Sequence, residues 1–84
     1  MTIRFLRIKD VMARLGKGRS AIYADVKDGT LPPPIKIGER ASAWLDSEIT
    51  HIQSARIAGS NAETIRILVA NLVEARVQVE GGVR

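Results

Sequence analysis

The sequence predicts a mainly α-helical fold with a small β-ribbon, a winged helix-turn-helix followed by a C-terminal helix. Three observations predict it. Two short helical patterns, over 8–15 and 18–28, are separated by a glycine. A ribbon-like stretch over 35–44 follows the second helix directly. A long segment over 60–80 then carries apolar residues at helical spacing.

The first helical pattern has one apolar face, because Ile8, Val11, Met12 and Leu15 lie at i, i+3, i+4 and i+7. Gly16 can end this helix in the left-handed conformation. The second helix starts near Gly18 and stops at Gly29. Its outer face is polar and basic, and comprises Arg19, Ser20, Tyr23 and Lys27, with Ala24 beside them. Alone, these two segments fit an ordinary helical hairpin as well as a DNA-binding helix-turn-helix.

The stretch after Gly29 favours the second of these, because it predicts a wing. Ile35 and Ile37 alternate with Lys36, a turn follows over 38–40, and the chain returns towards Trp44. The three prolines at 32–34 fix an extended backbone and predict a stiff connector rather than a ligand for an aromatic groove. We expect Trp44 to pack under the wing as the largest core side chain.

These residues carry a family resemblance. The pieces RFLRIKDV, RSAIY and LPPPIKIGERASAW, with a following D-S-E helix start, resemble the AlpA-type phage regulators and related excisionases. The resemblance covers residues 4–57. It implies a winged helix-turn-helix fold distantly similar to the MerR DNA-binding domain. The sequence departs from the family pattern at Gly18, Asp25, Pro33 and His51.

Seven residues are expected to contact double-stranded DNA. They are Lys17, Arg19, Ser20, Tyr23, Lys27, Lys36 and Arg40. Arg19 could read a guanine through a bidentate contact or clamp a phosphate. Tyr23 could reach a phosphate or pack against the wing. The resemblance places Arg40 over the minor groove or phosphates, and Asp25 has no assigned partner.

The charge distribution supports a DNA-binding half. Residues 1–41 hold nine basic and four acidic residues, a balance of +5, whereas residues 42–84 hold four basic and five acidic residues, a balance of −1. A protein-only adaptor needs no such positive surface. Arg14 and Lys17, which flank the predicted turn, are plausible phosphate contacts.

Composition argues against several other classes. The chain has no cysteine and one histidine, so we expect no disulfide and no metal site. The sequence has no phosphate loop and no nucleophile with a base, which argues against an enzyme, a cofactor or a small-molecule ligand. No apolar run is long enough to span a bilayer. We expect a cytoplasmic protein, bacterial or phage-encoded, that works on nucleoid DNA.

The N-terminal leader over 1–7 has three interpretations. Phe5 could fill the core while Arg4 and Arg7 stay solvated, the leader could be a basic arm, or a strand could pair with the wing or with a neighbouring molecule. Further on, Asp46 is a candidate N-cap for a third helix that buries Leu45, Ile49 and Ile52 and exposes His51.

The C-terminal segment is predicted to form a separate helix. Domain 1–58 would be the winged module, 59–80 a helix, and 81–84 a disordered tail. Ser60 and Glu63 form a predicted capping box. We expect the helix to mediate self-association, although it could instead fold back onto the winged module. The self-association residues would be Ile65, Leu68, Leu72, Ala75 and Val79.

Three functions fit this sequence. The favoured hypothesis is an excisionase, or recombination directionality factor, that self-associates on a mobile element's attachment site, bends it and biases a site-specific integrase towards excision. The second is an AlpA-like transcriptional regulator at a promoter. The third is a phage terminase small subunit.

Overall fold

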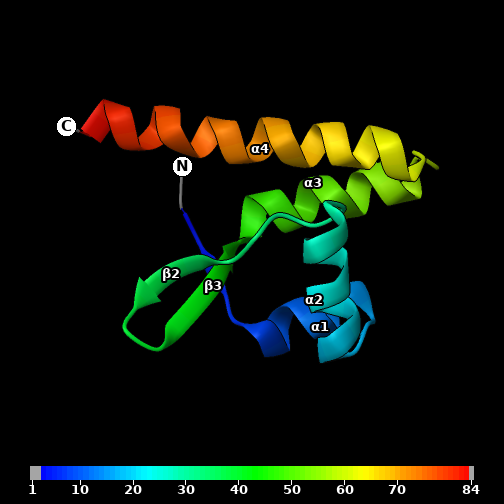
Figure 1. The fold of residues 1–84 in the computed structure, drawn as a ribbon, viewed down its shortest axis with the longest axis horizontal. Coiled ribbons are helices and arrows are strands. Elements are labelled where there is room, and N and C mark those ends of the chain that lie inside the picture. Colours follow the sequence, from blue (N-terminus) through cyan, green and yellow to red (C-terminus); the bar gives the residue numbers. More distant parts are fainter. Residues whose placement is uncertain (1–2, 84) are drawn as a thin grey trace.

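A computed structural model describes residues 3–83 of the chain, and side chains as far as Arg76. Its four helices and three strands confirm the predicted fold class, a mainly helical protein with a small antiparallel sheet (Figure 1). In chain order the elements are β1 (Phe5–Leu6), α1 (Ile8–Leu15), α2 (Arg19–Asp28), β2 (Ile35–Gly38), β3 (Ala41–Leu45), α3 (Asp46–Ile57) and α4 (Ala62–Val83).

The helix-turn-helix forms as its apolar spacing predicts. Val11 in α1 and Ile22 in α2 are both fully buried. Gly16 ends α1 with φ at 65°, and its N–H donates to the Met12 carbonyl oxygen at 2.8 Å. A left-handed residue is needed there, which is why glycine occupies the turn.

The wing belongs to a three-stranded antiparallel sheet in the order β1-β3-β2. The leader therefore pairs with the wing, with Leu6 opposite Trp44, and this confirms one of the three interpretations of residues 1–7. The expectation that Phe5 fills the core is wrong, because Leu6 is buried while Phe5 is 50% exposed. Neighbouring strand residues face opposite sides, and the register of β1 turns Leu6 inward.

Trp44 lies at the centre of the core and is fully buried, as predicted. Its indole Nε1 donates a hydrogen bond to the Pro32 carbonyl oxygen at 2.8 Å. A buried indole N–H needs such a partner. The same core includes Leu31 from the connector and Ile49 and Ile52 from α3.

The start of α3 differs from the prediction. Asp46 is the first helical residue rather than the N-cap, and Leu45 takes the cap position without a side-chain hydrogen bond. The Asp46 carboxylate does not cap the helix and instead accepts a hydrogen bond from Arg14 of α1 at 2.7 Å. A long-range partner has replaced the local cap.

The start of α4 also differs from the predicted capping box. Asn61 rather than Ser60 precedes the helix, and its Oδ1 accepts a hydrogen bond from the Thr64 N–H at 2.8 Å. Both side chains can cap a helix, and the registers differ by one residue. The helix continues to Val83, so residues 81–83 of the predicted disordered tail are helical, and Arg84 lies outside the described residues.

The apolar face of α4 packs within its own chain. Ile65 is 1% exposed and Val69 is also buried, both in the same core as Trp44. Leu68 and Leu72 pack against that core, and α4 lies along α3 (Figure 1). Three of the predicted self-association residues, Ile65, Leu68 and Leu72, therefore pack within the chain, as expected if the helix folds back onto the winged module.

Of the other two residues of that set, only Ala75 has a described side chain. Ala75 is exposed, and the side chain of Val79 lies outside the described ones. Apolar spacing along a helix cannot distinguish packing against the chain's own core from packing against a partner. The predicted module 1–58 and the predicted helix thus share one core.

A buried ion pair reinforces this packing. Arg76 of α4 donates through Nε to Glu48 Oε2 of α3 at 2.9 Å, and Glu48 is among the buried residues.

Within the described part of the chain, no helix is long and apolar enough to cross a membrane.

If α4 is part of the core, Ile65→Ala should lower the free energy of unfolding by about 2–5 kcal/mol, because it leaves a cavity. Ile67→Ala on the same helix is the matched control, since Ile67 is 59% exposed, and should change the free energy by at most about 0.5 kcal/mol. Urea unfolding followed by circular dichroism measures both. Equal effects of the two substitutions would contradict a core role for α4.

Candidate nucleic-acid interface

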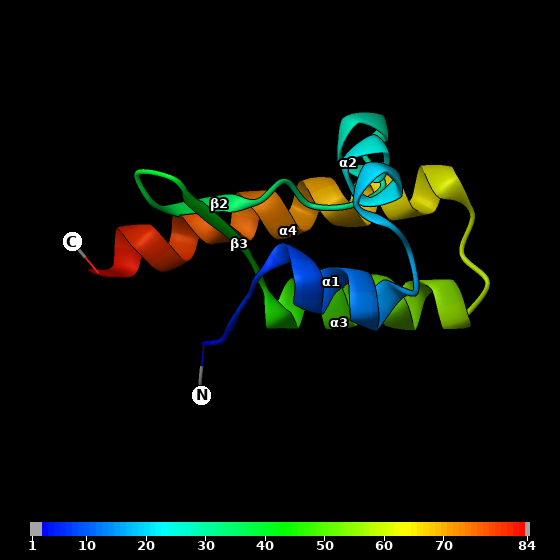
Figure 2. The ribbon, with the colours of Figure 1, turned by 90° about the horizontal axis from the view of Figure 1, so that it is seen from below.

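The first turn of α2 is exposed and carries no acidic side chain. Arg19 and Ser20 lie there, after an N-cap glycine, Gly18, that offers no side-chain hydrogen bond. The free backbone N–H groups and the positive end of the helix dipole favour an anion such as a phosphate. This turn and the turn of the wing lie on the side of the molecule away from α4 (Figure 1), and Figure 2 views the molecule from that side.

Two ion pairs neutralise the acidic residues of α2. Lys17 Nζ pairs with Asp25 Oδ2, which gives Asp25 the partner that the sequence left open. Arg66 of α4 pairs with Asp28. Without these partners, the two carboxylates would repel a phosphate backbone. Lys17, which was expected to contact DNA, is therefore engaged within the protein.

The remaining cations of α2 and the wing are available to a ligand. Each is exposed, and none makes an ion pair or side-chain hydrogen bond with another residue that the structure describes. They are Arg19 and Lys27 on α2, and Lys36 and Arg40 on the wing.

The wing places its cations through its register. Lys36 of β2 lies opposite Ser42 of β3, and an irregularity follows between Lys36 and Gly38. Arg40 lies in the turn that joins the two strands. The wing thus presents one cation on a strand and one at its tip.

Tyr23 has a place in both interpretations of its role. Its ring lies 6.1 Å from that of Trp44, centroid to centroid, at a tilted angle of 53°. The residue is nevertheless 44% exposed. One part of Tyr23 therefore packs against the base of the wing, and the rest is accessible to a ligand.

Arg14 was expected to contact phosphate, and it instead joins α1 to α3. Its guanidinium donates to Asp46 Oδ1 at 2.7 Å, to Gln53 Oε1 at 2.7 Å and to Thr50 Oγ1 at 3.0 Å. Gln53 Nε2 donates in return to the Arg14 carbonyl oxygen at 2.7 Å. The partners lie 32 to 39 positions away, so the local sequence carries no signal for them.

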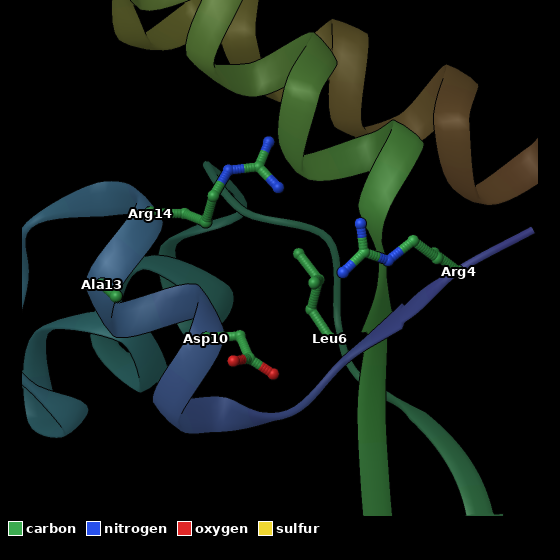
Figure 3. A pocket seen from close by; sticks show the side chains of 5 residues that line it. All are labelled: Arg4, Leu6, Asp10, Ala13 and Arg14. Carbon is green, nitrogen blue, oxygen red and sulfur yellow. The ribbon is translucent and has the colours of Figure 1, made fainter.

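This network borders a shallow pocket between the N-terminal strand and α1 (Figure 3). Arg4, Asp10 and Arg14 line it around Leu6. The hydrogen bond from Arg14 is the main cause that lowers the pKa of Asp46 below its ordinary value of 3.8, and the positive charges of Arg14 and Arg4 act in the same direction. The pocket thus lies beside the contacts that join the N-terminal segment, α1 and α3.

Among the residues that the structure describes, no group of three or more His, Asp or Glu side chains could hold a metal ion. His51 is exposed on α3, as expected.

Comparisons with known proteins agree with this geometry. The family model described as "Prophage CP4-57 regulatory protein (AlpA)" matches residues 4–57, so the match ends with α3 and leaves α4 outside it. A protein of Enterobacteria phage P4, "Uncharacterized protein ORF88", is 45% identical over 56 residues, which are 67% of this chain and 64% of that relative. The chain thus spans less than two thirds of the relative's length. No solved structure matches the chain.

The lowered pKa of Asp46 gives a pH-dependent prediction. Its stabilising contribution is present above its unfolded-state pKa and is lost as pH falls from that value towards the lower folded-state pKa. The stability difference between the wild type and Asp46→Asn should therefore be constant near neutral pH and shrink below about pH 4. Urea unfolding at several pH values measures it.

The matched control for this prediction is the same substitution in an Arg14→Gln background. There Asp46 has lost its main partner, so the difference should depend much less on pH. An unchanged pH dependence in that background would show that Arg14 is not the cause.

Proposed function

Because the chain belongs to the AlpA family, a regulatory DNA-binding family rather than an enzyme family, we propose that it binds specific sites in duplex DNA through α2 and the wing. The observation that carries this proposal is the set of exposed cations on these two elements that form no ion pair with a residue the structure describes. Arg19 and Lys27 lie on α2, and Lys36 and Arg40 lie on the wing. The start of α2 and the turn of the wing lie on the side of the molecule away from α4, and α1 lies on the same side (Figure 1).

The two elements would make different contacts. The N-terminal turn of α2 enters the major groove, where Arg19 makes a bidentate contact with a guanine and Ser20 bonds a base or a phosphate. Lys36 and Arg40 neutralise phosphates beside the groove and carry no sequence information of their own. Tyr23 adds its hydroxyl to the backbone contacts.

We expect log K for duplex DNA to fall with log salt with a slope of about −3 to −4, since four cations neutralise phosphates or lie close to them. Arg40→Ala should reduce the slope by about 1 and weaken binding to specific and random duplexes alike. Arg19→Ala should instead cost about 1–3 kcal/mol on the specific duplex. Fluorescence anisotropy at several salt concentrations measures both variants.

Arg56→Ala is the matched control, because Arg56 is an exposed arginine of α3 outside this interface. Equal losses on both duplexes for Arg19→Ala would make Arg19 a phosphate contact. No binding by the wild type at low salt would reject DNA binding altogether.

The finer proposal is that the protein is an excisionase. One small module buries little surface on DNA and reads few bases, so useful specificity needs several copies side by side. Adjacent copies would bend the duplex, and the contacts that the bend permits would offset its cost. A bent attachment site brings distant integrase sites together. A site-specific integrase is then the implied protein partner.

Contacts between neighbouring copies would have to avoid the face of α4 that the core occupies. Exposed apolar side chains elsewhere are candidates, in particular Ile37 on the wing, Ile57 at the end of α3 and Ile67 on α4. Self-association through these residues is part of the excisionase proposal.

A transcriptional regulator is the second candidate, because the matched family is described as a regulatory protein. One copy or one dimer near a polymerase site would suffice for that role, with no need for bending. The third hypothesis, a phage terminase small subunit, needs an oligomerising helix beside the winged helix-turn-helix. The packing of Ile65 and Val69 into the core leaves less of α4 for that role.

The excisionase proposal predicts that excision of a plasmid-borne element by its neighbouring integrase rises when the protein is co-expressed. It also predicts stepwise DNA mobility shifts on the attachment site, because several copies bind. Quantitative PCR of the excised junction and gel shifts measure the two effects. An Arg19→Ala, Arg40→Ala double variant is the control that lacks DNA contacts. Unchanged excision together with altered promoter output would favour the regulator.

A further inference from the structure

The connector between α2 and the wing contains three prolines at 32–34. Because proline has no N–H to donate, the backbone of these residues can only accept hydrogen bonds through its carbonyl oxygens. Trp44 Nε1 donates to the Pro32 carbonyl oxygen at 2.8 Å. Arg76 donates through NH2 to the Pro33 carbonyl oxygen at 2.9 Å. Consecutive carbonyls of the connector are thus fixed by the core and by α4.

The other end of the connector is held by the same helix. Arg66 of α4 donates through Nε to the Asp28 carbonyl oxygen at 3.0 Å, and through NH2 to both carboxylate oxygens of Asp28 at 3.1 and 3.2 Å. Asp28 is the last residue of α2. One helix, α4, therefore binds both the last residue of α2 and Pro33 of the connector, two positions before β2 begins.

The spacing of the two arginines fits an extended connector. Arg66 and Arg76 are ten residues apart on α4, which corresponds to about 15 Å along a helix. The five steps along the chain from Asp28 to Pro33 span at most about 18 Å when fully extended. The hydrogen bonds from Arg66 and Arg76 place both ends of this stretch against α4.

The Arg76 side chain, which binds the Pro33 carbonyl oxygen, is itself held in one orientation by Glu48. The Arg76 side chain is only 19% exposed and that of Glu48 only 4%, and the carboxylate accepts from both Nε and NH2 of the guanidinium. A guanidinium held at two atoms by a buried carboxylate has one orientation. That orientation aims it at the Pro33 carbonyl oxygen.

From these contacts we infer that α4 is a brace that fixes the wing relative to α2, and that Arg66 and Arg76 are positioning residues for DNA binding. The inference rests on the proposed function, since DNA must meet α2 and the wing at once. A protein that holds both elements in place before binding avoids the entropic cost of ordering them on DNA. Neither arginine touches DNA itself.

The distance between α2 and the wing can be measured without DNA. The chain has no cysteine, so Ala24→Cys on α2 and Glu39→Cys at the wing turn, both at exposed positions, accept a pair of spin labels. Pulsed electron paramagnetic resonance then gives the distribution of label distances. We expect a narrow distribution in the otherwise unchanged protein.

Two lesions test the brace in this labelled chain. Arg66→Gln removes the grip on Asp28, and Glu48→Gln with Arg76→Gln removes the grip on Pro33 without leaving a buried charge. Both should broaden the distribution while a cooperative thermal transition is kept. Arg56→Gln is the control and should leave the distribution narrow. If the second lesion does not fold, Arg66→Gln decides alone. A distribution as narrow as the wild type's in the folded lesions would overturn the brace.

A binding measurement connects the brace to DNA. Asp28→Asn with Arg66→Gln removes the grip and also the carboxylate that the arginine neutralises, so lost charge masking cannot explain weaker binding. We expect affinity for the specific duplex to fall by about 2- to 30-fold, the range of coupling through such contacts. Wild-type affinity in this variant would overturn the positioning role. A wild type that binds no DNA but has a narrow distance distribution would overturn the proposed function and leave the brace standing.

Discussion

The hydrogen bond from the Trp44 indole to the Pro32 carbonyl oxygen joins the three parts of the fold. Trp44 comes from the wing, Pro32 from the connector, and the buried ring contacts the core that α1, α2, α3 and α4 share. Because the prolines offer only acceptors, the connector depends on donors brought from elsewhere. One tryptophan therefore fixes both how the wing packs and where the chain leaves α2.

Ion pairs within the protein neutralise some of its cations and leave others free to bind a ligand. Arg14, Lys17, Arg66 and Arg76 each pair with a carboxylate. In the first half of the chain, some cations are therefore neutralised by a carboxylate within the protein and others are not. The exposed cations on α2 and the wing form no ion pair with a residue that the structure describes, and neither do Arg4, Arg7 and Lys9 near the N-terminus, so all of these remain for a partner.

Local patterns were sufficient to predict the helix-turn-helix, the wing and the buried Trp44, because apolar spacing and turn glycines act over a few residues. They failed where a distant partner decided the outcome. Asp46 binds Arg14 instead of capping α3. The apolar face of α4 packs against the core of the same chain. The register of β1 decided between Phe5 and Leu6, and no residue nearby in the sequence marks it.

The buried carboxylate of Glu48 has a consequence for synthesis on the ribosome. The family-matched residues emerge first, and they include a carboxylate whose guanidinium partner follows 28 positions later. Until Arg76 appears, burial of Glu48 is costly and the core lacks Ile65 and Val69. The nascent chain therefore cannot complete its core early, and folding is delayed until most of α4 has been made. A chain that ended before Arg76 would leave the Glu48 carboxylate without its guanidinium partner.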